Sequence, residues 1–251
     1  MPGYSQLFFQ HINITPFGDN KVYTCKICKS SINLAECKQI SSTCFFNHVP
    51  LDRYICPVCD VIFGTLDMIN GTMEKIKGDY LFCDKTFVEH NSIESEVKTF
   101  LSINPKKEGV YLNFGCGNKC TTIPQLRKQG WNIIGYEPFV PNDQPNIIKD
   151  KTELAKMRFN GVISNNLLEH LQDPVEDLLF MKSLLKDKSC LMAHSTACYK
   201  YLYEYSMYHL YFFLGKSVEH MCKSAGLIAT LNKDEITPLD GEYINYIYAQ
   251  K

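Results

Sequence analysis

The chain has 251 residues, of which 45% are hydrophobic and 21% are charged. This composition is typical of a folded protein with a buried core and excludes a largely disordered chain. The formal net charge is -1, so no long-range field attracts nucleic acid or an anionic membrane. These numbers favour small or neutral partners and argue against nucleic acid, and they do not indicate an oligomeric state.

Residues 1–20 contain no basic segment that leads into an apolar run. No stretch approaches the roughly 18 apolar residues of a membrane span. We therefore expect a cytoplasmic protein without a membrane span.

Six of the twelve cysteines fall between Cys25 and Cys59. In a reducing compartment such a cluster indicates metal ligation, and the scattered cysteines indicate small buried side chains. The pairs Cys25/Cys28 and Cys56/Cys59 each have the C-x-x-C spacing, which directs two thiolates of a tight turn at one ion. Two such turns predict a closed tetrahedral zinc site with a structural role.

Other residues of the same interval could also act as ligands. The two pairs are separated by 27 residues that include Cys37, Cys44 and His48, and each of these could replace one of the four. A redox pair is the alternative to zinc.

Changes of pattern predict three parts: an N-terminal extension with the zinc-binding module (1–75), a connecting helix (76–107) and a larger second domain (108–251). The module has short β-prone runs at Tyr54-Ile55 and Val61-Ile62-Phe63. Helical spacing predicts a helix from Asn91 to Ile103, with its N-cap at Asn91 or Ser92 and an apolar face of Ile93, Val97, Phe100 and Leu101.

After residue 108, short apolar strands alternate with amphipathic helices, which predicts an α/β domain with a mostly parallel sheet. The expected strands are Val110–Phe114, Asn132–Tyr136, Gly161–Ser164, Cys190–His194, Leu227–Leu231 and Tyr243–Ala249. The expected helices are Thr122–Gln129, Pro174–Leu185 and Ser217–Ser224. The last two strands predict an antiparallel hairpin that closes the sheet.

A ligand pocket is predicted where the first strand opens into Gly115-Cys116-Gly117 before a helix. Glycines let a ligand approach the backbone, and the helix N-terminus offers free N–H groups. Glu137 follows Gly117 by twenty residues, at the end of the next strand, where a carboxylate can accept hydrogen bonds from both ribose hydroxyls. Together these features predict an adenosine-containing ligand.

Three segments resemble the class I methyltransferases that use S-adenosylmethionine. Tyr111-Leu-Asn-Phe-Gly-Cys-Gly117 resembles their first motif, the run 159–174 with Leu-Leu-Glu-His-Leu-Gln-Asp-Pro resembles their fourth-strand motif, and the run 209–227 resembles a later segment. The resemblance implies a Rossmann-like fold and S-adenosylmethionine as cofactor. The residues that it implies around the cofactor are Asn113, Phe114, Gly115, Cys116, Gly117, Glu137, Pro138, Asn165 and Asn166.

A zinc module ahead of this domain is similar to the arrangement in bacterial sugar and surface-glycan methyltransferases. Some of these carry Tyr-x-Glu-His-Leu, and here the stretch is Ser206-Met-Tyr-His209-Leu210, which keeps the His. The resemblance implies a small-molecule or glycan acceptor and His209 as the base that assists in-line methyl transfer, with His170 and Tyr208 as the next candidates.

The chain departs from the family pattern in the first motif. Asn113 stands where the family has an acid, and Lys119 stands where it has a third glycine. Asn can still accept hydrogen bonds but carries no charge.

The Tyr-rich stretch 199–213 has two interpretations. It either stacks on sugar rings or packs on the sheet as a lid helix.

Two further functions stay open from the sequence. One is an rRNA or tRNA methyltransferase with a zinc ribbon, which predicts a basic face. The other is an inactive methyltransferase-like domain whose zinc module docks a protein partner.

Overall fold

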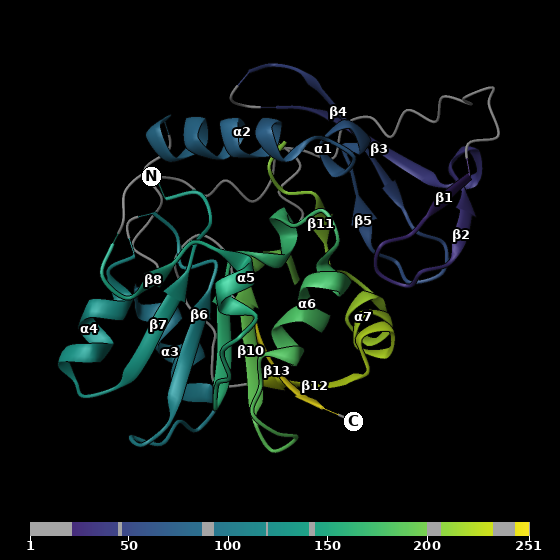
Figure 1. Ribbon diagram of the computed structural model, residues 1–251. Coiled ribbons are helices and arrows are strands. Elements are labelled where there is room, and N and C mark those ends of the chain that lie inside the picture. Colours follow the sequence, from purple (N-terminus) through teal and green to yellow (C-terminus); the bar gives the residue numbers. More distant parts are fainter. Residues whose placement is uncertain are drawn as a thin grey trace, which may run out of the picture.

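The computed structural model describes residues 22–44, 47–86, 93–118, 120–140, 144–199, 207–232 and 244–250. These residues form a seven-stranded sheet, a four-stranded sheet and a two-stranded ribbon. The seven-stranded sheet lies in the lower part of Figure 1, and the N-terminal strands lie above and to one side of it.

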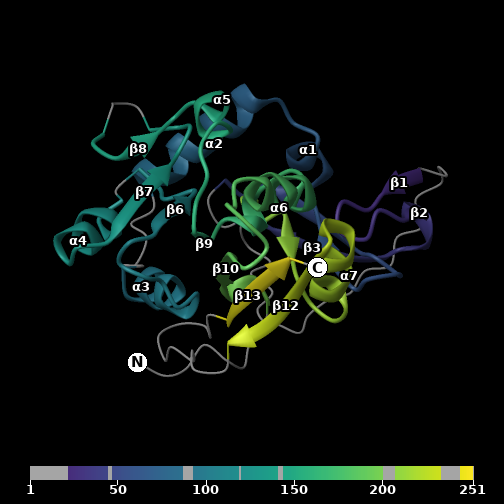
Figure 2. The same cartoon turned by 60° about the horizontal axis from the view of Figure 1, so that its bottom comes forward.

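The large sheet has the strand order β12-β13-β10-β9-β6-β7-β8. Strands β6 to β10 run parallel to one another, whereas β13 is antiparallel to both of its neighbours. Figure 2 shows β12 and β13 as the two yellow strands at the front. The strands are β6 (Val110–Phe114), β7 (Asn132–Tyr136), β8 (Ile147–Ile148), β9 (Gly161–Asn165), β10 (Leu191–Thr196), β12 (Leu227–Asn232) and β13 (Ile244–Gln250).

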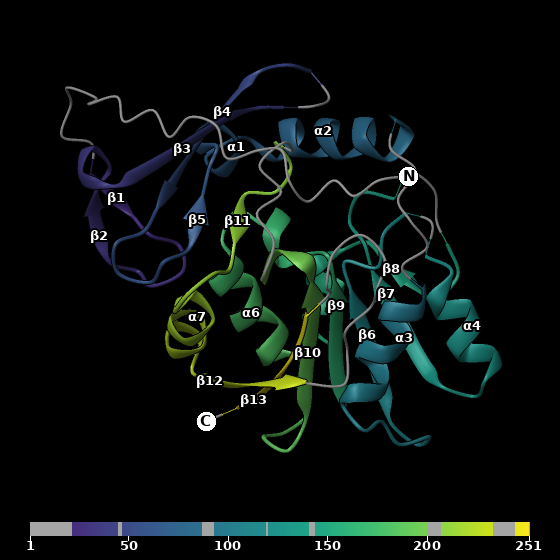
Figure 3. The same ribbon diagram turned by 180° about the vertical axis from the view of Figure 1, so that it is seen from behind.

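Helices cover both faces of this sheet, as expected for an α/β domain. Helices α3 (Ile93–Ser102) and α4 (Thr122–Lys128) lie on one face, with Phe100 and Leu126 packed against strand residues such as Tyr111. Because strand side chains alternate between faces, the neighbouring Leu112 points to the other face and joins a second core. The helices on that face are α5 (Lys151–Leu154), α6 (Pro174–Ser183) and α7 (Ser217–Ala225). Helix α6 lies in front of the sheet in Figure 1, and α3 lies in front of it in Figure 3, which shows the molecule from behind.

The N-terminal part contains the ribbon β1 (Val22–Thr24) and β2 (Ser31–Asn33), the 3-10 turn η1 (Leu34–Glu36), and strands β3 (Lys38–Thr43), β4 (Pro50–Ile55) and β5 (Ile62–Phe63). Helices α1 (Leu66–Ile69) and α2 (Met73–Thr86) follow. The fourth strand of the smaller sheet is β11 (Tyr211–Phe212), which comes from the C-terminal half and pairs antiparallel with β5. The two halves of the chain therefore share a sheet.

Most of the expected elements are present. Strands β6 and β7 have the predicted bounds, and the antiparallel C-terminal hairpin is confirmed. The expected apolar face of α3 was wrong in part: Leu101 is 49% exposed, whereas Glu96 and Thr99 are buried. The predicted N-cap at Asn91 or Ser92 lies outside the described residues. None of the described helices has the length and apolarity needed to cross a membrane.

Candidate functional site

The candidate site lies at the carboxyl ends of the parallel strands. From β6 the chain moves outward to β7 and β8, and it then returns to β9 on the opposite side of β6. In open α/β sheets, ligands bind at such a switch point, outside the carboxyl ends of the strands. The predicted cofactor residues lie at or just after the ends of β6, β7 and β9, and His170 follows β9. His209 precedes β11 and lies beside His170.

The glycine turn after β6 has the backbone conformation that favours glycine. Gly115 has φ 73° and Gly117 has φ 74°, values that strain residues with a Cβ. The N–H groups of Gly115 and Cys116 both donate to the carbonyl of Tyr136, at 2.8 and 3.2 Å, which ties the turn to the end of β7. A Cβ at Gly117 would point into open space. The backbone there is open to a ligand.

Glu137 closes the other side of this turn. Its side chain is 6% exposed, and its carboxylate accepts hydrogen bonds from the N–H groups of Gly117 at 3.1 Å and Phe139 at 3.2 Å. The structure thus brings together the glycine turn and the acid that the sequence placed twenty residues later. Each carboxylate oxygen can accept more than one hydrogen bond.

Asn113 contacts a residue that the sequence analysis did not assign to the site. The Asn113 side-chain amide donates to Glu96 Oε2 at 3.1 Å, and both side chains are buried. Asn113 Oδ1 has no hydrogen-bond partner among the described residues. Glu96 lies in the first turn of α3. From the sequence alone, an acidic residue at this position indicates only the start of a helix.

The remaining cofactor candidates surround this edge. Phe114 is buried and packs against the tilted ring of Tyr136 with 4.8 Å between ring centroids, whereas Pro138 is exposed. Asn165 bonds to α3: its Oδ1 accepts from Thr99 and its Nδ2 donates to Ser95.

Asn166 lies in the left-handed region with φ 45°. Cys116 is buried within the glycine turn. Lys119 lies outside the described residues.

A second cluster of polar side chains lies beyond β9 and β10. Glu169 and His170 belong to the 3-10 turn η2 (Leu168–His170), and the ring of His170 is 4.9 Å from that of His209 between centroids. One ligand-type atom from each of these three side chains lies within 4.8 Å of the others. The structure therefore brings together the first two catalytic candidates of the sequence analysis.

Glu169 is fully buried and holds its negative charge. Thr196 donates a short hydrogen bond to Oε1, and His194 Nε2 lies 3.7 Å from Oε2. Burial by itself raises the pKa of Glu169, but the contact with His194 and the attraction of His170, His194 and His209 lower it to about 2. The carboxylate is ionised at neutral pH and faces three imidazoles.

The two histidines differ in their surroundings. The pKa of His209 is lowered to about 3, chiefly by burial and also by the neighbouring His170, whereas the charge of Glu169 opposes this shift. His170 Nδ1 lies 2.8 Å from the backbone carbonyl of Tyr208. A carbonyl only accepts hydrogen bonds, so this nitrogen carries the proton and Nε2 of the neutral ring carries the lone pair.

Tyr208 touches the site through this carbonyl, and its side chain is half-buried. Tyr201, Tyr203 and Tyr205, which belong to the Tyr-rich stretch, lie outside the described residues.

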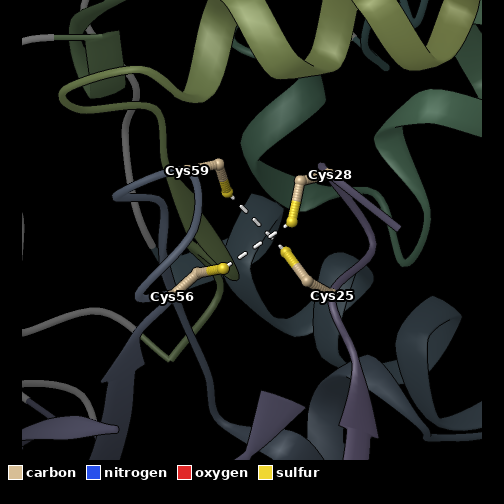
Figure 4. Close-up of side chains that lie close together, drawn as sticks. All are labelled: Cys25, Cys28, Cys56 and Cys59. Atoms are coloured by element: carbon tan, nitrogen blue, oxygen red, sulfur yellow. Dashed lines mark hydrogen bonds between the residues drawn. The ribbon is translucent and has the colours of Figure 1, made fainter. Parts of the chain in front are cut away.

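Four cysteine side chains converge in the N-terminal part (Figure 4). The sulfurs of Cys25 and Cys59 are 3.8 Å apart, and those of Cys28 and Cys56 are 3.7 Å apart. One sulfur from each of the four lies within 4.8 Å of the others. A tetrahedral ion with metal–sulfur bonds of roughly 2.3 Å holds its sulfurs roughly 3.8 Å apart. The cluster therefore fits one such ion.

Two turns of the same kind build this cluster. In the first, the N–H of Lys29 donates to the carbonyl of Cys25, and in the second, the N–H of Asp60 donates to that of Cys56. Lys29 has φ 60° and Asp60 has φ 65°. This conformation folds each C-x-x-C segment so that its two thiols face the same point.

The alternative ligands belong to neither of the groups that could hold a metal among the described residues. His48 and Cys44 form a third turn of this kind, with the N–H of His48 donating to the Cys44 carbonyl. The second thiol is missing there, because Asn47 stands at its position. Cys37 donates to the carbonyl of Asn33.

The module contacts the histidine cluster through β11. The N–H of Gly64, after β5, donates to the carbonyl of Leu210 at 3.1 Å. The N–H of Leu210 donates to the carbonyl of Glu169 at 2.7 Å. Leu210 immediately follows His209, so the backbone next to His209 is held by both the module and η2.

Comparisons with known proteins agree with this geometry. A family model described as "Methyltransferase domain" matches residues 88–230. No curated protein matches the chain.

Two solved structures are similar in fold. One is 1,6-didemethyltoxoflavin-N1-methyltransferase from Burkholderia thailandensis, solved with 1,6-didemethyltoxoflavin and S-adenosylhomocysteine (11% identity, TM-score 0.56, covering 84% of this chain and 99% of that one). The other is a SAM-dependent methyltransferase from Archaeoglobus fulgidus (15% identity, TM-score 0.51, covering 68% and 99%).

Proposed function

This chain belongs to the class I methyltransferases that use S-adenosylmethionine, and we propose that its acceptor is a sugar, a nucleotide sugar or a surface glycan. The observation that carries the proposal is the pairing of a glycine turn and Glu137 with a histidine cluster at the same sheet edge. The first provides a place for the cofactor, and the second provides a base for an acceptor.

The residues of the first group fit the cofactor. Glu137 offers carboxylate oxygens to the ribose hydroxyls, Gly117 leaves open space next to the backbone, and Asn113 Oδ1 offers a buried acceptor. When bound, S-adenosylmethionine supplies a methyl group that leaves its sulfonium by in-line displacement. The protein then has to hold the acceptor atom about 3 Å from the methyl carbon and remove its proton.

We place the base in the pair of His170 and His209. His170 has its Nε2 lone pair available because Nδ1 donates to the Tyr208 carbonyl. The ionised Glu169 stabilises the positive charge that develops on an imidazole when it takes the proton, as a buried carboxylate does in catalytic triads. His209, which is neutral at physiological pH, is suited to accept a hydrogen bond from a hydroxyl.

We propose zinc as the ion of the four-cysteine cluster, with a structural role. The four thiol groups match a tetrahedral site in number and spacing and leave no open position for a substrate. The module also contacts the backbone next to His209, so we propose that it forms a wall of the acceptor site. This arrangement and the resemblance of the sequence to sugar methyltransferases support a carbohydrate acceptor.

The experiment is a methyl-transfer assay with S-adenosylmethionine labelled in the methyl group and a panel of nucleotide sugars, glycans and transfer RNA. We expect label in a carbohydrate and none in RNA, and loss of that label in Glu137→Ala. Label in RNA alone would contradict the carbohydrate proposal. A folded protein that binds the cofactor but labels no acceptor would instead favour an inactive methyltransferase-like domain whose zinc module docks a protein partner.

A further inference from the structure

His194 is a buried titratable side chain to which the proposed mechanism gives no role. It lies on β10, and both His194 and Glu169 are 1% exposed. His194 Nε2 is 3.7 Å from Glu169 Oε2, and neither atom has a hydrogen-bond partner among the described residues. This distance exceeds a hydrogen bond of roughly 3.0 Å by less than an ångström. Because two unpaired polar groups in the interior are costly, the surroundings favour a bond between them.

The other ring nitrogen of His194 contacts Ser164. The two residues are register partners on the adjacent strands β9 and β10, and Ser164 Oγ is 2.7 Å from His194 Nδ1. A hydroxyl can donate to an unprotonated Nδ1, which leaves the proton of the neutral ring on Nε2. The other tautomer would direct the lone pair of Nε2 at the carboxylate of Glu169. The two contacts together therefore select the ring that has its N–H directed at Glu169.

The carboxylate of Glu169 is thereby held at both of its oxygens. Thr196 donates a short hydrogen bond to Oε1, and His194 faces Oε2. Residues two apart on a strand point to the same face, so both supports come from one face of β10, an interior strand of the large sheet. The strand thus determines the orientation of this carboxylate as well as its charge.

The titratable groups around Glu169 come from β10, from two 3-10 turns and from the segment before β11. Burial raises the pKa of Glu169, and three imidazoles more than offset this effect. Two further groups feel its charge but stay neutral, because burial raises their own pKa well above the ordinary values. The imidazoles are those of His170, His194 and His209, the neutral groups are Cys198 and Tyr199 of η3 (Ala197–Tyr199), and Arg53 of β4 acts on His209 and Cys198.

We infer that His194, held by Ser164, is a positioning residue of methyl transfer, whose Nε2–H keeps Oε2 of Glu169 in place behind the two histidines of the base. The inference rests on the proposed function, because it concerns the carboxylate that supports the proposed base. His194 acts through Glu169 and does not touch the acceptor in this role. Without its N–H, the buried carboxylate has one support fewer, which favours the protonated form. A protonated Glu169 no longer stabilises the positive charge on the base, so the transfer rate falls.

The first measurement needs no acceptor. NMR of the protein with isotope-labelled histidine rings reports which ring nitrogens carry a proton, and the signals of His194 are those that disappear in His194→Gln. At neutral pH we expect a protonated Nε2 and an unprotonated Nδ1. A protonated Nδ1 would overturn the inference, and this result is obtained from the wild-type protein whether or not a variant folds.

Two variants at position 194 separate positioning from packing. His194→Phe keeps a flat ring beside Tyr199, whose ring centroid is 5.8 Å away, but loses the N–H donor. His194→Gln keeps an N–H donor in its side-chain amide. NMR of labelled glutamate carboxyl groups follows the protonation of Glu169. We expect its pKa to rise by about one or more in His194→Phe, as for the loss of a hydrogen bond to a charged group, and to stay low in His194→Gln.

Initial rates measure the catalytic consequence, with the methyl-labelled cofactor and the same panel of carbohydrates. We expect kcat to fall about tenfold or more in His194→Phe and to stay within about threefold of the wild type in His194→Gln. S-adenosylhomocysteine affinity should stay within about twofold in both variants. His220→Gln on α7 is the control for the loss of an imidazole and should change none of these quantities.

Equal rate losses in the two variants, or an unchanged pKa of Glu169 in His194→Phe, would overturn the inference. A wild-type protein that labels no acceptor would refute the proposed function, and with it the catalytic role of His194. The NMR measurements distinguish the two failures, because they detect the contact between His194 and Glu169 without an acceptor.

Discussion

At the scale of single residues, the site depends on the protonation states of two side chains, Glu169 and His209. Glu169 stays ionised among three imidazoles, and His209 stays neutral because of its burial. Both pKa values are lower in the folded protein than the ordinary values, so both groups connect stability with pH.

We predict that acid destabilises the fold through these two groups. The pKa of His209 is about 6.5 when unfolded and about 3 when folded, so the unfolded state binds more protons between these values. The free energy of unfolding therefore falls as the pH decreases from 6.5, by at most about 1.4 kcal/mol per pH unit for this group. Glu169 adds a loss from pH 4.5 toward about 2.

Urea unfolding at a series of pH values measures this dependence. In His209→Gln the loss of stability between pH 6.5 and 4.5 should be smaller than in the wild type. An identical slope in the variant would contradict the depressed pKa of His209.

We predict a catalytic defect without a binding defect for His170→Asn. Loss of a general base lowers kcat about 10²- to 10⁴-fold, and the glycine turn and Glu137 are left unchanged. Initial rates and calorimetry with S-adenosylhomocysteine separate the two effects. His220→Asn on α7 is the control and should keep full activity, whereas a loss of cofactor affinity in His170→Asn would speak against the proposed role.

At the scale of elements, Asp173 connects the module to the catalytic domain. Its carboxylate caps α6 by accepting from the N–H of Glu176, and it also pairs with Lys29 of the first cysteine turn at 2.9 Å. The Asp173 side chain thus caps the start of α6 and also forms an ion pair with the module.

We predict that Asp173→Ala costs about 1–2 kcal/mol, the sum of a lost N-cap and a partly exposed ion pair. Asp150→Ala is the comparison, because Asp150 caps α5 and shows no contact with the module among the described residues. Chemical denaturation should show the larger effect in Asp173→Ala. Equal effects would mean that the Lys29 pair adds nothing.

The elements also show how far sequence reasoning reaches. Strands β6 and β7 were predicted with their exact bounds, because β-prone runs end there in turn residues. Strand β11 was missed, since two aromatic residues have no periodicity and its partner β5 lies far away in the chain. Glu96 was missed for the same reason: its contact with Asn113 depends on how α3 packs on the sheet.

At the scale of the whole molecule, the four-cysteine part of the chain and the methyltransferase part form one structure. Residues of the cysteine turns, such as Ile27 and Val61, share a hydrophobic core with Leu210 and Met221. Strand β11 extends the module's sheet immediately after His209. Loss of the metal should therefore affect the acceptor side of the site more than the cofactor side.

We predict one zinc per chain and a selective effect of its loss. Cys56→Ala should lose the metal and lower the melting temperature and the transfer rate, with the rate falling about tenfold or more, while S-adenosylhomocysteine affinity changes little. Metal analysis by mass spectrometry, thermal melting and calorimetry measure the three quantities. Cys37→Ala and Cys44→Ala are controls that should keep the zinc, and loss of zinc in either would show that the ligand set is different.

The most direct test of the proposed cofactor site is a calorimetric titration of the zinc-loaded protein with S-adenosylmethionine, alongside Glu137→Ala. We predict micromolar binding by the wild type, with a loss of about 100-fold or more in the variant because both ribose hydroxyls lose their carboxylate acceptor. Absence of binding by the folded wild-type protein, or equal binding by the variant, would contradict the proposed cofactor site.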